Sequence, residues 1–382
     1  MNSVIGYYST KFGELWKMSL DDLFLAASCG VLESTKLEIG QIDAVFIGNM
    51  LGGVVDNQLL LSAHISEILE VDIPIYRLEA ACASGGMAFQ TANEYLKSHP
   101  ESTVLVVGAE KMTDISATDI TTALSTAASL DEQKVGLTFP GVYALLAQVY
   151  LNEYGYNEEH LAAVSVKNHA HGVLNDNAHF QRYVTIDNVL ESPYIAYPLK
   201  VLDSSPISDG AAALILSNNK QLIKTRNSSV ILASEMATDN ISISKRRNLD
   251  EIYSTKKAGT EAFKKSKIIP LDVNVMEVHD CFSIAEILAL EDLGFWKKGT
   301  GGGYAKEMAT HIDSGNNLIV NTSGGLKAAG HPVGGTGVKQ IGEVYLQLTG
   351  QAKRRQVKNT KYGLAHNVGG SGGVAIVTIL GV

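Results

Sequence analysis

The sequence predicts an α/β fold, and three observations carry this prediction. Fully apolar runs of strand length recur along the chain, as at residues 44–48 and 104–109. Segments between them place apolar residues at helical spacing, as at residues 21–29. The turns that follow the strands are rich in glycine and other small residues. This alternation predicts a layered fold in which mostly parallel strands are covered by helices.

The first part of the chain alternates regularly between the two kinds of element. Strands are expected at residues 4–8, 44–48, 73–76 and 104–109, and helices at 21–29, 58–69 and 86–96. From residue 110 to about 202 the rhythm changes, and two helices are expected at 140–154 and 158–174. We interpret this segment as an insertion that caps the core, because a buried strand returns at 209–216.

A second α/β half starts near residue 230. Strands are expected at 231–233, 273–278, 317–321 and 375–380, with a helix at 283–293, a basic surface flap at 244–257 and a glycine-rich turn at 324–337. Strand, small-residue turn and helix follow one another in both halves, which suggests a duplicated fold with a site at the pseudo-twofold seam. The predicted boundaries are 1–115 for the N-terminal half, 116–200 for the insertion, 201–228 for the return of the first half and 229–382 for the second.

Composition narrows the class of protein. A chain of 382 residues fits two fused domains, and a net charge of −9 argues against a nucleic-acid partner. The three cysteines are too few for a disulfide framework and lack zinc-ligand spacing, so a reducing compartment and no metal are expected. The N-terminus lacks the pattern of a signal peptide, and no apolar run has the length of a membrane span. These features predict a cytoplasmic enzyme.

Cys82 is the residue around which the chain is organised. It lies at a strand-to-helix turn among small residues, where unpaired N–H groups and the helix dipole favour the thiolate. This position therefore predicts a lowered thiol pKa and a nucleophilic role. A small core cysteine beside tight packing is an equally good interpretation of this stretch alone.

Three further loops carry candidate reactive groups, at residues 279–282, 330–337 and 366–373. Each ends a strand or begins a helix, where α/β enzymes place reactive groups. Each also has a purely structural interpretation, as a hydrogen-bonded loop, a turn or a tight crossing. No Gly-x-Gly-x-x-Gly follows the first strand and no Walker A sequence is present, so a nucleotide site is not indicated.

Taken together and in this order, the four loops resemble the thiolase superfamily. Cys82 resembles its acyl-accepting cysteine and His331 its Gly-His-Pro histidine, while 279–282 reads His-Asp-Cys-Phe, as in the sterol-carrier-protein-type and archaeal acetoacetyl-CoA thiolases. The usual second cysteine of a Cys-x-Gly motif is replaced by Asn367. The resemblance covers the whole chain and implies the thiolase fold, a duplicated five-layer αβαβα arrangement with an inserted loop domain.

The resemblance also implies roles for the site residues. Cys82 would be the nucleophile, His331 the base that activates it, and Cys281 the acid/base for the second substrate. His279 and His331 would donate hydrogen bonds to an enolate oxygen, and the backbone N–H groups of Cys82 and Gly369 would hold an oxyanion. Asp280 receives no chemical role and is expected to cap a helix.

Candidates for substrate binding come from several segments. The basic residues Lys245, Arg246 and Arg247 could meet the phosphates of coenzyme A, although a solvated basic loop is at least as good an interpretation. The remaining candidates are expected to line a pantetheine tunnel or to pack in the core: Phe139, Tyr143, His169, Ser323 and Gly324.

The resemblance implies an acetyl-CoA C-acetyltransferase that condenses two acetyl-CoA reversibly through an acyl-cysteine and feeds mevalonate synthesis. The alternatives are a 3-ketoacyl-CoA thiolase, a thiolase-fold aldolase, and a non-catalytic lipid- or CoA-binding scaffold. Coenzyme A would be a substrate, and no cofactor is expected. Expected partners are a second copy of the chain, as a homodimer or homotetramer, and 3-hydroxy-3-methylglutaryl-CoA synthase held through a zinc-ribbon/OB-fold protein.

Overall fold

A computed structural model describes all residues from 1 to 382. The strands of the first half are β1 (Ser3–Ser9), β2 (Ala44–Gly48), β3 (Ile75–Leu78), β4 (Thr103–Glu110) and β7 (Gly210–Ser217). Its helices are α1 (Leu20–Thr35), α2 (Leu61–Leu69) and α3 (Ser84–Ser98). Between β4 and β7 lie α4 (Ala117–Ser125), α5 (Leu130–Lys134), α6 (Phe139–Tyr154), α7 (Glu158–Val173), α8 (Ile186–Glu191), β5 (Tyr194–Ala196) and β6 (Leu199–Lys200).

After α9 (Lys220–Lys224), the second half repeats the plan of the first. Its strands are β8 (Ser229–Thr238), β9 (Val275–Glu277), β10 (Ile319–Val320), β11 (Tyr362–Gly369) and β12 (Val374–Gly381). Its helices are α10 (Tyr253–Ser266), α11 (Ser283–Asp292), α12 (Gly301–Lys306), α13 (Gly325–Ala329) and α14 (Val333–Leu348).

The two halves have the same strand order and the same strand directions. The ten strands run β10-β9-β11-β12-β8-β1-β7-β4-β2-β3, so numbering each half separately gives 3-2-4-5-1 in both. In each half the second strand pairs in parallel with the third and fourth, and the fifth is antiparallel to the fourth and the first. The predicted duplication is confirmed. The prediction of mostly parallel strands is wrong, because every pair that involves the first or last strand of a half is antiparallel.

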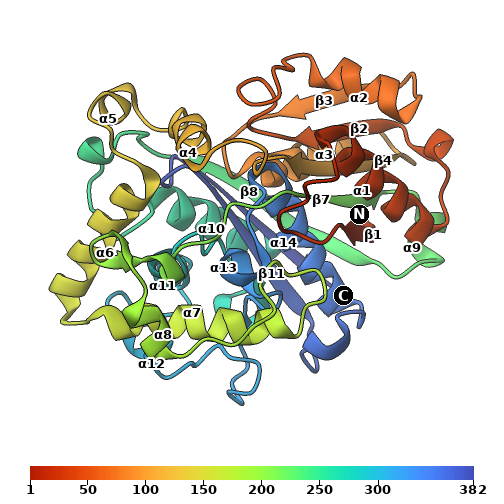
Figure 1. Cartoon of the computed structure of the whole chain (residues 1–382). Helices are drawn as coiled ribbons and strands as arrows, with labels where there is room; N and C mark the ends of the chain where they lie inside the picture. Colours follow the sequence, from red (N-terminus) through yellow and green to blue (C-terminus); the bar gives the residue numbers. More distant parts are fainter.

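The helices complete five layers with the two halves of the sheet. Figure 1 shows α14 in the middle of the molecule. On one outer face α1 packs on β1, β4 and β7, and on the other α10 packs on β8 and β12. Between the sheet halves α3 and α14 pack against each other and against strands of both halves. The α4–α8 segment lies together on the side of the molecule away from α1 and α2 (Figure 1).

The central helices cross at glycines. A Cβ atom on Gly85 would lie 2.6 Å from the carbonyl oxygen of Gly334, and one on Gly108 would lie 2.2 Å from the same oxygen. Real side chains do not tolerate such distances, so α3, α14 and the end of β4 approach closely only because these positions lack side chains. This crossing brings the residues just before α3 close to those just before α14.

Several predicted elements differ in detail. The glycine-rich turn expected at 324–337 contains α13 and the first turn of α14, because glycine at these positions allows close helix packing rather than a loop. His366 and Asn367 lie within β11, where they pair with Val377 and Ile376, and not in a loop before the last strand. The expected flap at 244–257 ends in α10, whose first residue is Tyr253. The predicted domain boundaries stay predictions. No helix has the length and apolar character needed to cross a bilayer.

Replacing Gly85 with Ala tests the helix crossing. The added methyl group meets backbone on α14, which cannot move like a side chain, so we expect destabilisation of about 1–3 kcal/mol. Denaturant unfolding followed by circular dichroism measures it. The control is Gly40→Ala, where a Cβ atom would meet nothing within 4 Å. Equal stability of the two variants would contradict this account of the crossing.

Candidate active site

One cavity of about 400 Å³ is lined by three of the four candidate reactive residues, whereas the fourth, His279, is buried and does not line it. Cys82, Cys281 and His331 all line it, although they come from three separate segments of the chain. Most of the rest of the wall is apolar and includes residues of α6 and of the 201–207 segment. The cavity therefore lies between the two duplicated halves and the segment that separates β4 from β7.

Cys82 lies in a tight turn between β3 and α3. Ala81 has a left-handed backbone (φ +51°), which is unfavourable for a residue with a side chain. Ser84 holds the turn, because its hydroxyl accepts the Ala80 N–H at 3.0 Å and donates to the Ala81 carbonyl at 2.6 Å. The strained backbone at residue 81 presents the sulfur of Cys82 to the cavity.

The predicted lowering of the Cys82 pKa is wrong. Burial raises the pKa of the thiol to about 12, and the nearby Glu110 carboxylate adds to this effect. Hydrogen bonds from the N–H groups of Gly370 and of Cys82 itself oppose the rise. Nearby N–H groups therefore favour the thiolate, but the larger of these effects comes from Gly370, after β11, and removal of the sulfur from water outweighs both. Cys82 is a neutral thiol at rest and needs a base.

Two imidazoles lie beside this thiol. The Cys82 sulfur and one ring nitrogen each of His279 and His331 all lie within 4.8 Å of one another. The two rings are 5.1 Å apart between centroids and nearly perpendicular, at 83°. Residues from both halves thus meet in one site, as the sequence interpretation required.

His331 lies two residues before α14. Its Nδ1 is 2.7 Å from the Thr336 hydroxyl, on the first turns of that helix. Burial lowers the pKa of His331 to about 3, so the ring is neutral. A neutral imidazole beside a neutral thiol is the arrangement in which the ring can take the thiol proton.

His279 and Cys281 lie in the loop between β9 and α11. Burial lowers the pKa of His279 well below its usual value, with the His331 ring adding to the effect. Burial raises the pKa of Cys281, and a hydrogen bond from the Tyr143 hydroxyl offsets part of this rise. Both groups are therefore uncharged at rest.

Asp280, in the same loop, caps a helix as expected. Its carboxylate accepts the backbone N–H of Leu326 at 2.7 Å and of Lys327 at 3.2 Å, in the first turn of α13. Asn168 of α7 donates to it as well, at 2.7 Å. Asp280 fixes the loop against α13, which leads directly to His331.

Gly369 is the site of another close approach. A Cβ atom there would lie 2.2 Å from the carbonyl oxygen of Ala80, so only glycine lets β11 reach the Cys82 turn. The N–H that contacts the Cys82 sulfur is that of the next residue, Gly370. The oxyanion role of the Gly369 N–H stays a prediction.

The aromatic candidates divide between cavity and core. Phe139 and Tyr143 of α6 line the cavity. His169 does not line it, because its ring is buried against Phe180, with centroids 5.8 Å apart, and its Nδ1 contacts the Arg182 carbonyl oxygen at 3.1 Å. His169 is a packing residue that positions the Phe180–Arg182 segment.

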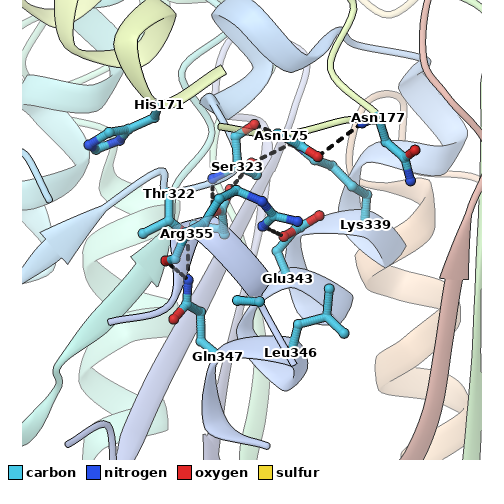
Figure 2. Close-up of polar contacts among 12 residues, drawn as sticks. His171, Asn175, Asn177, Thr322, Ser323, Lys339, Glu343, Leu346, Gln347 and Arg355 are labelled. Atoms are coloured by element: carbon cyan, nitrogen blue, oxygen red, sulfur yellow. Dashed lines mark hydrogen bonds and ion pairs between the residues drawn. The ribbon is translucent and has the colours of Figure 1, made fainter. Parts of the chain in front are cut away.

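Ser323 and Gly324 also lie away from the cavity. Figure 2 shows Ser323 in a buried polar network with Asn175 and Lys339. Lys339 donates to the Ser323 hydroxyl at 2.7 Å, and this hydroxyl donates to Glu277 at 2.6 Å. Gly324 packs closely on Gly172 of α7. Both residues stabilise the approach to α13, a role that their position in a glycine-rich string did not reveal.

The basic residues that reach the cavity differ from the predicted ones. Lys245, Arg246 and Arg247 do not line it, and Arg246 is held by the carbonyl oxygen of Ser371 at 2.6 Å. Arg182 and Lys327 do line it. Lys327 is only 2% exposed, and burial lowers its pKa to about 8. The lysine in the Gly-Gly-Leu-Lys string was the available sequence signal.

A thiol beside two neutral imidazoles, on a duplicated five-layer fold, defines the class of site. The thiolase N-terminal domain family matches residues 3–220, and the thiolase C-terminal domain-like family matches residues 236–382. The chain belongs to the thiolase family.

Relatives span its whole length. It is 43% identical over 380 residues to an acetyl-CoA acetyltransferase of Methanothermobacter thermautotrophicus, covering 99% of this chain and 98% of the relative. It is 32% identical over 398 residues to human sterol carrier protein 2, covering 98% of this chain and 71% of that protein. Among solved structures, an Ltp2-ChsH2(DUF35) aldolase matches with a TM-score of 0.84 at 21% identity, covering 100% of this chain and 97% of that chain. Human mitochondrial 3-ketoacyl-CoA thiolase matches with a TM-score of 0.73 at 17% identity, covering 100% of this chain and 98% of that chain.

His366 offers a test of how burial sets protonation near the site. Burial lowers the pKa of His366 to about 3, so below pH 6.5 this ring binds a proton in the unfolded chain but not in the folded protein. Stability contributed by the neutral ring is present above pH 6.5 and is lost as the pH falls. We expect the unfolding free energy of the wild type, relative to that of His366→Gln, to drop by about 2–3 kcal/mol between pH 8 and pH 4.5. Equilibrium denaturation at both pH values measures it.

The same substitution at the exposed His99 is the matched control. A relative stability of wild type and His366→Gln that stayed constant with pH would contradict the neutral, buried state of this ring.

Proposed function

We propose that the protein is an acetoacetyl-CoA thiolase, which converts two acetyl-CoA reversibly to acetoacetyl-CoA and coenzyme A through an acyl-cysteine. The observation that carries the proposal is the meeting of Cys82, His279 and His331 within 4.8 Å beside a cavity that Cys281 also lines. Full-length relatives named acetyl-CoA acetyltransferase, at 41–43% identity, support this substrate class over longer acyl chains.

Acylation begins with the neutral groups of the resting site. His331 takes the Cys82 proton, and the sulfur attacks the thioester carbonyl. Backbone N–H groups at Cys82 and Gly369 would hold the oxyanion, and one such donor is typically worth ~3 kcal/mol of barrier. The C–S bond to coenzyme A then breaks, and the leaving thiolate takes the proton from His331. Acetyl-Cys82 and free coenzyme A result.

Carbon–carbon bond formation uses the second sulfur. Cys281 first passes its thiol proton to His331, which is neutral again once coenzyme A has left. The Cys281 thiolate then takes a proton from the methyl carbon of a second acetyl-CoA, and this carbon attacks acetyl-Cys82 while His279 donates to the enolate oxygen. The Cys82 thiolate leaves and takes the proton held on His331. In thiolysis the neutral thiol of Cys281 protonates the departing acetyl-CoA carbanion, and burial favours this neutral form.

Coenzyme A would enter along the cavity wall that carries the cations. Arg182 and Lys327 lie beside Phe180, with the Arg182 guanidinium carbon 5.3 Å and the Lys327 nitrogen 5.9 Å from its ring centroid. These two cations are better candidates for the phosphates of coenzyme A than Lys245, Arg246 and Arg247.

A homo-oligomer is part of the proposal. β3 ends the ten-stranded sheet, and its Tyr76 is 43% exposed; Leu59 and Leu60, just before α2, are exposed as well. An edge strand and exposed apolar residues suit pairing with a second copy.

The proposal also includes a partner, a pathway and a location. The partner is a zinc-ribbon/OB-fold protein that links the enzyme to 3-hydroxy-3-methylglutaryl-CoA synthase. The pathway is mevalonate synthesis, and the location is the cytoplasm. The fold neighbour named an Ltp2-ChsH2(DUF35) aldolase supports a partner of this kind.

Thiolysis tests the activity directly. With free coenzyme A, the purified protein should cleave acetoacetyl-CoA faster than 3-ketoacyl-CoA substrates of longer chain, as followed by loss of the substrate absorbance. Cys82→Ala should abolish turnover and the acetyl adduct seen by mass spectrometry after acetyl-CoA is added, because no other sulfur sits beside both imidazoles. An adduct retained in this variant would refute the nucleophile, and preference for long chains would favour a degradative thiolase.

Cys281→Ala separates the two half-reactions. Acetylation of Cys82 should continue, since His331 activates that sulfur, whereas condensation should fall by about 10²–10⁴-fold with the loss of its acid/base group. Rapid-quench mass spectrometry measures acylation, and acetoacetyl-CoA formation measures condensation. Unchanged condensation would remove Cys281 from the mechanism.

A further inference from the structure

Asn367 occupies a slot built between the two central helices. It lies on β11, and its side chain points between Gly86 of α3 and Gly337 of α14. A Cβ atom on Gly86 would lie 2.8 Å from the Asn367 amide oxygen, and one on Gly337 would lie 2.2 Å from it. Two glycines on different helices thus make room for one amide group.

The contacts within this slot fix which way the amide points. Its oxygen accepts the Gly86 N–H at 3.1 Å, and its nitrogen donates to the Cys82 carbonyl oxygen at 3.0 Å. A flipped amide would face a donor with its own N–H and an acceptor with its own oxygen. Both hydrogen bonds would be lost, and two buried groups would be left unpaired.

The remaining N–H of the amide faces His279. The Asn367 nitrogen is 3.3 Å from His279 Nδ1, at the long end of hydrogen-bond range. Because this nitrogen can only donate, Nδ1 must carry the lone pair. In a neutral ring the hydrogen then lies on Nε2, which is buried and has no hydrogen-bond partner in the protein. The ring thus keeps one unpaired N–H that can donate to a substrate oxygen, and one of its two nitrogens lies within 4.8 Å of the Cys82 sulfur.

The neighbouring ring has the opposite arrangement. The Thr336 hydroxyl donates its single hydrogen to the Pro332 carbonyl oxygen at 2.9 Å, so it accepts from His331 Nδ1–H. The lone pair of His331 is therefore on Nε2. Two neutral imidazoles side by side thus differ in one proton position, because their Nδ1 atoms meet a donor in one case and an acceptor in the other.

We propose that Asn367 is a positioning residue that holds His279 in the tautomer with its hydrogen on Nε2, and so makes it a hydrogen-bond donor beside the basic His331. The tautomer assignment stands on geometry alone. Its consequence, donation to the thioester or enolate oxygen, rests on the proposed thiolase activity. With the lone pair on Nε2 instead, His279 could not donate this hydrogen bond, since the lone pairs of the ring nitrogen and of the substrate oxygen would repel each other.

Asn367→Asp replaces the hydrogen-bond donor that faces His279 Nδ1 with an acceptor, with almost no change in side-chain size. A carboxylate in the slot can only accept, so it draws the hydrogen to Nδ1 and leaves the lone pair on Nε2. Solid-state ¹⁵N NMR of protein labelled at histidine distinguishes the two ring nitrogens by their bonded hydrogen, and subtraction of a His279→Asn spectrum identifies His279.

The wild type should show the hydrogen of His279 on Nε2, and Asn367→Asp should show it on Nδ1. The control is Asn175→Asp, at another buried asparagine, which donates to the Ser323 carbonyl oxygen (Figure 2) and does not line the cavity. It should leave the His279 signals unchanged. A wild-type ring with its hydrogen on Nδ1 overturns the proposal, whether or not the variant folds.

Kinetics supply the second measurement. In Asn367→Asp we expect condensation to fall about 100-fold or more, with a smaller effect on acetylation of Cys82, and Asn367→Ser, which cannot force either tautomer, should fall between it and the wild type. A reversed tautomer with unchanged condensation overturns the donor role but leaves the tautomer assignment intact. Absence of any thiolase activity in the wild type refutes the proposed function and leaves the NMR result to decide the tautomer.

Discussion

The close crossing of α3 and α14 is the contact on which the site depends. Cys82 stands just before one helix and His331 just before the other, and the two segments are about 250 positions apart in the sequence. Because Gly85 and Gly334 carry no side chains, backbone meets backbone and the two helix starts share one small volume. Glu110 at the end of β4 stabilises the junction, since its carboxylate accepts N–H groups from Met50, Leu51 and Gly334.

Burial at this crossing decides the charge state of the reactive groups. Removal from water keeps both thiols protonated and both imidazoles neutral, against the pull of the helix start on Cys82. A site whose thiol is protonated at rest is compatible with acyl transfer, because the Cys82 proton need only move to the His331 ring beside it. Such a site depends on where hydrogens lie within it, which is why Asn367 and Thr336 matter as much as the groups that they contact.

The two halves share one fold but contribute different residues to the site. Both halves have the strand order 3-2-4-5-1, yet Cys82 comes from the first half, while His279, Cys281 and His331 come from the second. The segment between β4 and β7 has no counterpart in the second half and provides Phe139, Tyr143 and Arg182 to the cavity. The pseudo-twofold arrangement thus brings two unlike loops together beside a cavity, and part of the cavity wall comes from a segment that only one half contains.

The sequence by itself predicted the fold class and the duplication, because strand and helix periodicities are local. It also named four candidate reactive residues, because the motif strings at element ends resemble those of thiolases. Tertiary structure alone decided the rest. Strand direction depends on which strands become neighbours, and the sheet proved mixed. The Cys82 pKa depends on burial, which local position does not report. Ser323 turned inward to Glu277 and Lys339, and Arg182 and Lys327 replaced the predicted cations, because which side chains face a cavity is set by packing among distant segments. The proton position on His279 rests on an asparagine 88 residues away, a contact that only folding creates.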